Sequence, residues 1–120
     1  MKKILSSLRC AGKGIGYAAA TERNFRVQLL IFVLVMIAAG VLDIAKIEVA
    51  LMLAVSALLF SLELANTAIE RLADKVSPQY DEQIGRVKDI MAGAVLVAAV
   101  FACVIGLVIF YEPLLKIFHF

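Results

Sequence analysis

Residues 90–111 read IMAGAVLVAAVFACVIGLVIFY, a run of twenty-two residues without a charged side chain. A helix of about 20 apolar residues crosses the hydrocarbon core of a bilayer. This run is therefore predicted to be a transmembrane helix. The whole chain has 120 residues, of which 63% are hydrophobic and only 18% charged. That length allows one domain, and the composition indicates an integral membrane protein rather than a soluble or disordered one.

Two shorter apolar runs precede this segment. Residues 29–42 and 49–62 each contain fourteen residues without a charge, so each must extend into flanking residues to span a bilayer. We expect spans over residues 27–46 and 47–74, joined by a tight helical hairpin at 43–46. A buried hairpin of a soluble protein is the alternative, but residues 29–42 lack the polar face that it needs. The predicted fold class is all-α, with three transmembrane helices.

Residues 1–22 differ in kind from the three spans. They mix Lys2, Lys3, Arg9 and Lys13 with apolar side chains, and no apolar core of a secretory signal follows the lysines. Such a mixture is typical of an amphipathic helix that lies along the membrane surface. The sequence GKGIG at 12–16 does not match a phosphate-binding glycine loop, so we interpret its small residues as packing positions.

The positive charges divide unevenly between the two sides of a three-span chain. Ten of the twelve lysines and arginines fall on the side of the N-terminus and the second loop, and only Lys46 and Lys116 fall on the other. The positive-inside rule places the N-terminus and residues 71–88 in the cytoplasm.

Several classes of function are disfavoured by the remaining composition. No basic run with interleaved aromatic residues is present, so nucleic-acid binding is not expected. Cys10 and Cys103 lie far apart and Cys103 is inside an apolar run, which argues against a disulfide or a thiolate metal site. The single histidine, His119, is the penultimate residue of the sequence, and we interpret it as a solvated residue rather than a catalytic one.

The second apolar run continues into a polar helix end. At about 100° per residue, one stripe of this helix carries Ser56, Glu63, Asn66, Glu70 and Asp74. A carboxylate at the bilayer centre costs roughly 2.5–3.5 kcal/mol on insertion scales, so Glu63 is interpreted as functional. For Glu70 and Asp74 a solvated helix end is the alternative. The acidic groups of the stripe repel one another, so a positive charge is expected to face them. It can come from arginine or lysine of the surface helix, or from Mg²⁺, which prefers carboxylate oxygens.

A second polar group lies between this helix and the third span. It includes Gln79, Tyr80, Asp81, Lys88 and Asp89. A lysine at the start of a span can meet a phosphate as a point charge, and an aspartate there can hold a ligand hydroxyl. The alternative interpretation makes Lys88 a positive-inside anchor and Asp89 a helix N-cap.

These features together resemble the prokaryotic diacylglycerol kinase family, which includes undecaprenol kinases. The resemblance rests on ELANTAIE at 63–70, on Asp74, on KD at 88–89 and on ERNFR at 22–26. Three spans behind a surface helix also match the family's architecture, and the resemblance covers nearly the whole chain.

The resemblance implies a lipid kinase of the bacterial inner membrane that depends on ATP and Mg²⁺ and works as a homotrimer with shared active sites. It implies Glu63 as the general base, Glu22 and Glu70 as metal ligands, and Asn66 and Asp74 as supporting residues. The nucleotide contacts that it implies are Glu22, Glu70, Gln79, Tyr80, Asp81, Lys88 and Asp89. The lipid contacts that it implies are Glu63, Asn24 and Arg26.

The resemblance leaves two lipid substrates open. The triplet ERN at 22–24 is similar to the undecaprenol kinase branch, whereas the spacing from Asp74 to Lys88 is similar to the diacylglycerol kinase branch. The loop reads QYD at 79–81, where the best-known diacylglycerol kinase pattern has Glu-Tyr-His. We favour undecaprenol over diacylglycerol.

A small multidrug transporter is the alternative function, because such proteins also combine a short hydrophobic chain with a glutamate in the membrane. They are expected to have four spans and a glutamate in the first, whereas residues 29–42 contain no acidic side chain. An accessory subunit of a larger membrane complex is a third interpretation, and it leaves the polar stripe unexplained.

Overall fold

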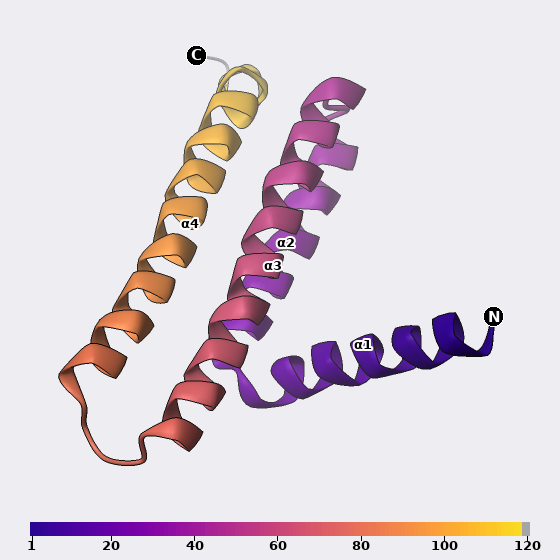
Figure 1. Ribbon diagram of the computed structural model, residues 1–120. Helices are drawn as coiled ribbons and strands as arrows, with labels where there is room; N and C mark the ends of the chain where they lie inside the picture. Colours follow the sequence, from indigo (N-terminus) through magenta and orange to yellow (C-terminus); the bar gives the residue numbers. More distant parts are fainter. Residues whose placement is uncertain (119–120) are drawn as a thin grey trace.

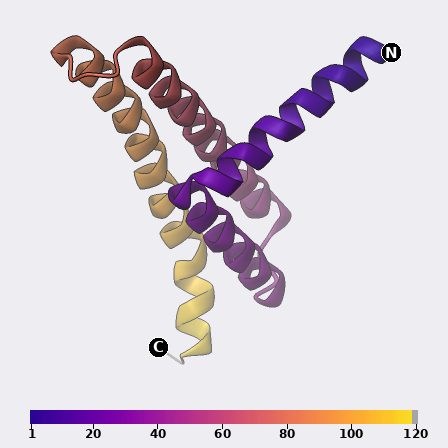
Figure 2. The same ribbon diagram turned by 90° about the horizontal axis from the view of Figure 1, so that it is seen from below.

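The computed structural model describes residues 1–118, and all the regular secondary structure in that range is helical. Its elements are α1 (Lys2–Thr21), α2 (Arg23–Val41), α3 (Lys46–Val76) and α4 (Glu82–Ile117). The last three lie together as a bundle, and α1 points away from it (Figures 1 and 2). Each of these three helices is long and apolar enough to cross a membrane. The predicted all-α, multi-pass membrane fold is confirmed; His119 lies outside the described residues.

The first hairpin ends α2 earlier than the expected boundary at residue 46. Leu42 is the C-cap, and the N–H of Ile44 donates to the carbonyl oxygen of Ala39 at 3.0 Å while that of Asp43 donates to Gly40 at 3.3 Å. These two hydrogen bonds form a Schellman motif, which requires a left-handed residue just after the cap. Asp43 supplies it with φ 55°. The chain therefore reverses within four residues and starts α3 at Lys46.

The helix α3 continues well beyond its apolar part. Alanine, leucine and glutamate, all good helix formers, keep residues 63–74 helical, and the helix ends at Val76 just before Pro78. This extension agrees with the expected end near Asp74. The polar stripe is thus carried by one uninterrupted helix, which leads from the membrane-spanning part to the loop at 77–81.

The helix α4 begins eight residues before the apolar run that revealed it. Asp81 is its N-cap, and the Asp81 Oδ1 atom accepts a hydrogen bond from the backbone N–H of Gln83 at 3.1 Å. The interpretation of Asp89 as an N-cap is therefore wrong, because Asp89 lies two turns inside the helix. The cap forms where the chain leaves the turn that follows Pro78, not where its hydropathy rises.

Two groups of contacts hold the bundle together. Ala39, Met52 and Ile109 form a small apolar cluster that joins α2, α3 and α4. Nearer the start of α2, the ring of Phe60 packs edge-on against Phe25 and Phe32, with centroid distances of 6.0 and 5.3 Å. The aromatic contacts fix the rotation of α2 against α3 at the level of Glu63.

A single extended residue separates α1 from α2. Glu22 has φ −106° and ψ 109° and serves as the cap of both helices. The Nη1 atom of Arg26 donates to the carbonyl oxygens of Ala19 and Ala20 at 2.9 and 3.0 Å, which satisfies acceptors that the end of α1 leaves free. The start of α2 thereby holds the end of α1. That α1 lies on a membrane surface stays a prediction.

Candidate active site

Glu63 lies in the interior of the bundle. Its side chain comes from α3, and the residue is only 3% exposed. The Glu63 Oε2 atom accepts a hydrogen bond from Nε2 of Gln28 on α2 at 3.1 Å. Thr67, one turn further along α3, donates its hydroxyl to the backbone carbonyl of Glu63 at 3.1 Å. Burying a carboxylate without a cationic partner is costly, so its presence here indicates a functional role.

A second pair of an amide and a carboxylate lies one turn along the same stripe. The Nδ2 atom of Asn66 donates to Oε1 of Glu70 at 3.4 Å. Each amide thus faces a glutamate with its NH₂ group, and the amide oxygens of Gln28 and Asn66 are buried without a hydrogen-bond partner in residues 1–118. Buried polar atoms normally have a partner, so these two oxygens indicate that donors arrive from outside the single chain.

Glu22 reaches α3 from the break between α1 and α2. Its Oε1 atom lies 2.6 Å from Nη2 of Arg71, the residue that follows Glu70. The guanidinium of Arg71 also lies over the ring of Tyr17, 5.7 Å from the centroid. The structure therefore brings Glu22 to the end of α3 that carries Glu70.

The donor chemistry at this end of α3 suits Mg²⁺. The ion is usually held by one or two carboxylates, with waters and substrate phosphates completing its octahedron. Glu22 and Glu70 offer two carboxylates, and the NH₂ group of Asn66 holds one oxygen of Glu70. Within the described chain, no group of three or more histidine, cysteine, aspartate or glutamate side chains forms a complete metal cage.

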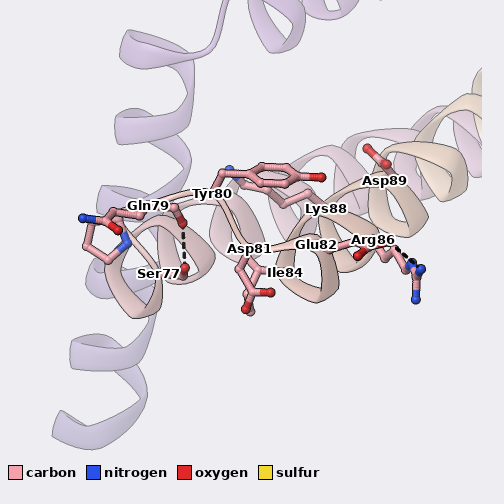
Figure 3. A pocket seen from close by; sticks show the side chains of 11 residues that line it. Ser77, Gln79, Tyr80, Asp81, Glu82, Ile84, Arg86, Lys88 and Asp89 are labelled. Atoms are coloured by element: carbon pink, nitrogen blue, oxygen red, sulfur yellow. Dashed lines mark hydrogen bonds and ion pairs between the residues drawn. The ribbon is translucent and has the colours of Figure 1, made fainter.

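The loop between α3 and α4 forms a pocket of about 410 Å³ (Figure 3). Five residues singled out from the sequence line it, namely Gln79, Tyr80, Asp81, Lys88 and Asp89. The Ser77 hydroxyl donates to the backbone carbonyl of Gln79 at 2.7 Å, which shapes the turn. The ring of Tyr80 is 88% exposed along the rim and available to a ligand.

An ion pair joins this pocket to the polar stripe. The Nζ atom of Lys88 lies 2.5 Å from Oδ1 of Asp74. The hydrogen bond with Asp74 is the largest effect on the pKa of Lys88 and raises it; desolvation lowers the pKa by less than this, and the negative charges of Asp74 and Glu70 raise it further. Lys88 is thus held as a cation between the pocket and the last turns of α3.

The two expected lipid contacts lie at the start of α2, apart from the pocket. Asn24 is exposed and makes no side-chain hydrogen bond within residues 1–118. Arg26 is exposed, and its guanidinium is occupied by the carbonyl oxygens at the end of α1. Their roles as lipid contacts stay predictions.

Sequence reasoning missed Gln28 as a site residue. It lies 35 residues from Glu63, and only the packing of α2 on α3 joins them. The available signal was a polar side chain at the margin of an apolar run, where leucine or valine is expected.

Comparison with known proteins agrees with this arrangement of residues. A family model described as "Prokaryotic diacylglycerol kinase" matches residues 9–110, a range that holds every residue of the candidate site. The chain belongs to this family. The resemblance seen in the sequence is thereby confirmed.

The relatives of this chain are named as kinases of two different lipids. "Diacylglycerol kinase" of Synechocystis sp. is 42% identical over 115 residues, which cover 95% of this chain and 66% of that protein. "Undecaprenol kinase" of Bacillus subtilis is 37% identical over 114 residues, 95% of this chain and 93% of that protein. "Diacylglycerol kinase" of Escherichia coli is 30% identical over 102 residues, 85% and 84% respectively. All three are named lipid kinases, so the predicted class of enzyme is confirmed.

Proposed function

We propose that this chain transfers the γ-phosphoryl group of ATP to the hydroxyl of a membrane lipid alcohol. The observation that carries the proposal is Glu63, a carboxylate buried to 3% exposure in a membrane-spanning helix. A charged group there is selected against unless it acts. Its partner is the neutral amide of Gln28, so the carboxylate has no cation that would compete with an incoming proton.

The proposed reaction uses Glu63 as the general base. Phosphoryl transfer depends mainly on positioning and on charge neutralisation around the phosphates. The carboxylate takes the proton of the lipid hydroxyl while the hydroxyl oxygen forms a bond to the γ-phosphorus. The bond from phosphorus to the β,γ-bridging oxygen breaks, and ADP leaves. Lys88, in the pocket of the α3–α4 loop, is placed to meet the polyphosphate as a point charge.

Mg²⁺ is the proposed cofactor, with Glu22 and Glu70 as its protein ligands. When bound, it would neutralise charge on the phosphates. Because Arg71 now pairs with Glu22 at 2.6 Å, this guanidinium has to turn aside for Glu22 to serve as a ligand. Asn66 holds Glu70 through its amide NH₂ group and so acts as a supporting residue. Asp74 supports the site through Lys88.

We propose undecaprenol over diacylglycerol as the lipid. The sequence ERN at 22–24 supports this preference. The Bacillus subtilis relative named undecaprenol kinase supports it as well, because the aligned region covers 93% of that protein. The proposal also includes a homotrimer with shared active sites in the bacterial inner membrane. In that arrangement α1 lies on the cytoplasmic surface, with Ile4, Leu5 and Leu8, each at least 63% exposed, available to the lipid.

A competition assay tests class and substrate together. The purified protein is placed in lipid nanodiscs with equimolar undecaprenol and diacylglycerol, and radiolabelled ATP is added with and without Mg²⁺. We expect labelled lipid only with Mg²⁺, and more undecaprenyl phosphate than phosphatidic acid. No labelled product from either lipid overturns the proposed function. A product that is mainly phosphatidic acid overturns only the preference for undecaprenol.

A further inference from the structure

Gln28 is the only side chain in residues 1–118 that hydrogen-bonds the carboxylate of Glu63. Its Nε2 atom lies 3.1 Å from Oε2 of Glu63, and no hydrogen bond within this range engages the other carboxylate oxygen, Oε1. One oxygen is therefore held and the other is left for a donor. A lipid hydroxyl that gives up its proton to Glu63 is such a donor.

The orientation of the Gln28 amide follows from its neighbours. A carboxylate only accepts hydrogen bonds, so the NH₂ end of the amide must face Glu63. The amide oxygen then points away and is buried without a partner. The amide oxygen of Gln28 thus has no partner within residues 1–118, while the NH₂ group of the same amide holds Glu63.

Aromatic packing fixes the two helices where Gln28 meets Glu63. Phe25 and Phe32 stand about one turn before and after Gln28 on α2, and both pack edge-on against Phe60. Phe60 itself lies one turn before Glu63 on α3. Because these rings restrain the rotation of α2 and α3, the hydrogen bond between Gln28 and Glu63 has a defined geometry rather than a chance one.

We propose that Gln28 is a positioning residue for Glu63. Its amide holds Oε2 so that Oε1 faces the hydroxyl of the lipid alcohol, and its neutrality leaves the carboxylate free of a competing cation. This role rests on the proposed function as a lipid kinase. It predicts that loss of the Gln28 donor slows the chemical step while leaving the binding of both substrates intact.

Three variants test the role of Gln28. Gln28→Met keeps the length of the side chain and removes the donor, whereas Gln28→Asn keeps a neutral amide donor on a side chain one methylene shorter. Thr67→Val is the matched control, because Thr67 is buried and bonds the backbone of Glu63 but not its carboxylate. We expect kcat to fall about 10- to 100-fold in Gln28→Met, in line with a hydrogen bond to a charged group. The KM values for ATP and lipid stay within about twofold, and Gln28→Asn recovers part of the loss in kcat.

The outcomes separate this inference from the proposed function. If wild type is active and Gln28→Met keeps the wild-type kcat, Gln28 does not position the base. If Gln28→Met raises KM instead of lowering kcat, Gln28 belongs to substrate binding and the inference is overturned. An inactive wild type overturns the proposed function and this inference with it.

A thermal double-mutant cycle supplies a readout that does not depend on turnover. Gln28→Met and Glu63→Met are measured singly and together by circular dichroism in detergent. We expect Gln28→Met to lower the unfolding midpoint in the wild-type background and to have a smaller effect when Glu63 is already methionine. Equal effects in the two backgrounds mean that the two side chains are not coupled, which overturns the inference.

Discussion

Glu63 differs in its hydrogen-bond partner from Glu22 and Asp74, the two acidic side chains of the site that form ion pairs. Glu22 pairs with Arg71, and Asp74 pairs with Lys88. Glu63 instead receives one hydrogen bond from an amide. An ion pair lowers the capacity of a carboxylate to accept a proton, whereas a neutral donor orients it without cancelling its charge. No lysine or arginine within residues 1–118 pairs with the carboxylate of Glu63, which is what its proposed role as a base requires.

Replacement of Glu63 gives the most direct test at this scale. We expect Glu63→Gln to lower kcat by about 100- to 10,000-fold, because a general base typically contributes that much. The amide has nearly the same shape as the carboxylate and can still accept from Gln28, so the fold is retained. The measurement is ATP-dependent lipid phosphorylation in nanodiscs, with circular dichroism for the fold.

Glu48→Gln is the matched control for this substitution. Glu48 is a half-buried glutamate in the first turn of the same helix, far from Glu63 along α3. We expect this variant to keep wild-type turnover. Appreciable turnover in Glu63→Gln removes Glu63 from the role of base.

The ion pair of Lys88 and Asp74 makes a prediction about pH. The hydrogen bond and charge of Asp74 raise the pKa of Lys88 above its unfolded value of about 10.4. The stability that this pair contributes is therefore fully present below about pH 10.4 and is lost as the pH rises through the folded pKa. We expect the unfolding midpoints of wild type and Lys88→Met to differ by a constant amount from pH 6 to 9 and to converge above about pH 10.5.

Lys75→Met serves as the control for Lys88. Lys75 is an exposed lysine at the end of α3 without an acidic partner in the described chain. Its replacement is expected to leave the midpoint close to wild type at every pH. A difference between wild type and Lys88→Met that disappears already near pH 7 contradicts the assignment, because Lys88 is protonated there.

At the scale of elements, the hairpin between α2 and α3 stores a small strain. Asp43 adopts φ 55°, a left-handed conformation that costs most residues about 1–2 kcal/mol and glycine nothing. We expect Asp43→Gly to raise the free energy of unfolding by up to about 1 kcal/mol, since the Schellman hydrogen bonds are kept. Urea or thermal unfolding in detergent measures the change.

Asp43→Ala is the comparison for this prediction. Alanine keeps the steric cost of the left-handed conformation and loses the local hydrogen bonding that lets aspartate tolerate it. We expect the order of stability Gly above Asp above Ala at this position. If alanine is as stable as glycine, the left-handed conformation at residue 43 is not present in the membrane-embedded protein.

The helices were predictable because a bilayer demands long apolar runs. Residues 90–111 revealed α4, and the helix-forming residues before Pro78 predicted the extension of α3 to about Asp74, two residues short of its end at Val76. Helix ends were less predictable, since a cap depends on backbone geometry rather than on hydropathy. For this reason the N-cap of α4 is Asp81, and Asp89, two turns later, lies inside the helix.

The site was predictable from the residues where it lies on one helix or in the short loop that follows it. The spacing of Glu63, Asn66 and Glu70 follows from the period of a single helix. The pairs of Gln28 with Glu63 and of Glu22 with Arg71 depend on how α2 is rotated against α3. No local pattern encodes that rotation, which the edge-on contacts of Phe60 determine.

At the scale of the whole molecule, the charged site gathers at one end of the bundle. The α3–α4 loop lies at that end, while the α2–α3 hairpin and the end of α4 lie at the other (Figure 1). The start of α2 and the attached end of α1 lie toward the loop end, since Arg71 contacts both Glu22 and Tyr17. All but two of the lysines and arginines therefore belong to the half of the molecule that would bind ATP.

This distribution predicts the orientation in the membrane. The positive-inside rule places the loop at residues 77–81 in the cytoplasm, where ATP is available, and Lys46 on the opposite face. In a background of Cys10→Ser and Cys103→Ser, we expect Lys46→Cys to react with a membrane-impermeant maleimide in intact spheroplasts. Ser77→Cys should react only after the membrane is opened. Labelling of Ser77→Cys in intact spheroplasts would show the opposite orientation. A site with that orientation cannot use cytoplasmic ATP.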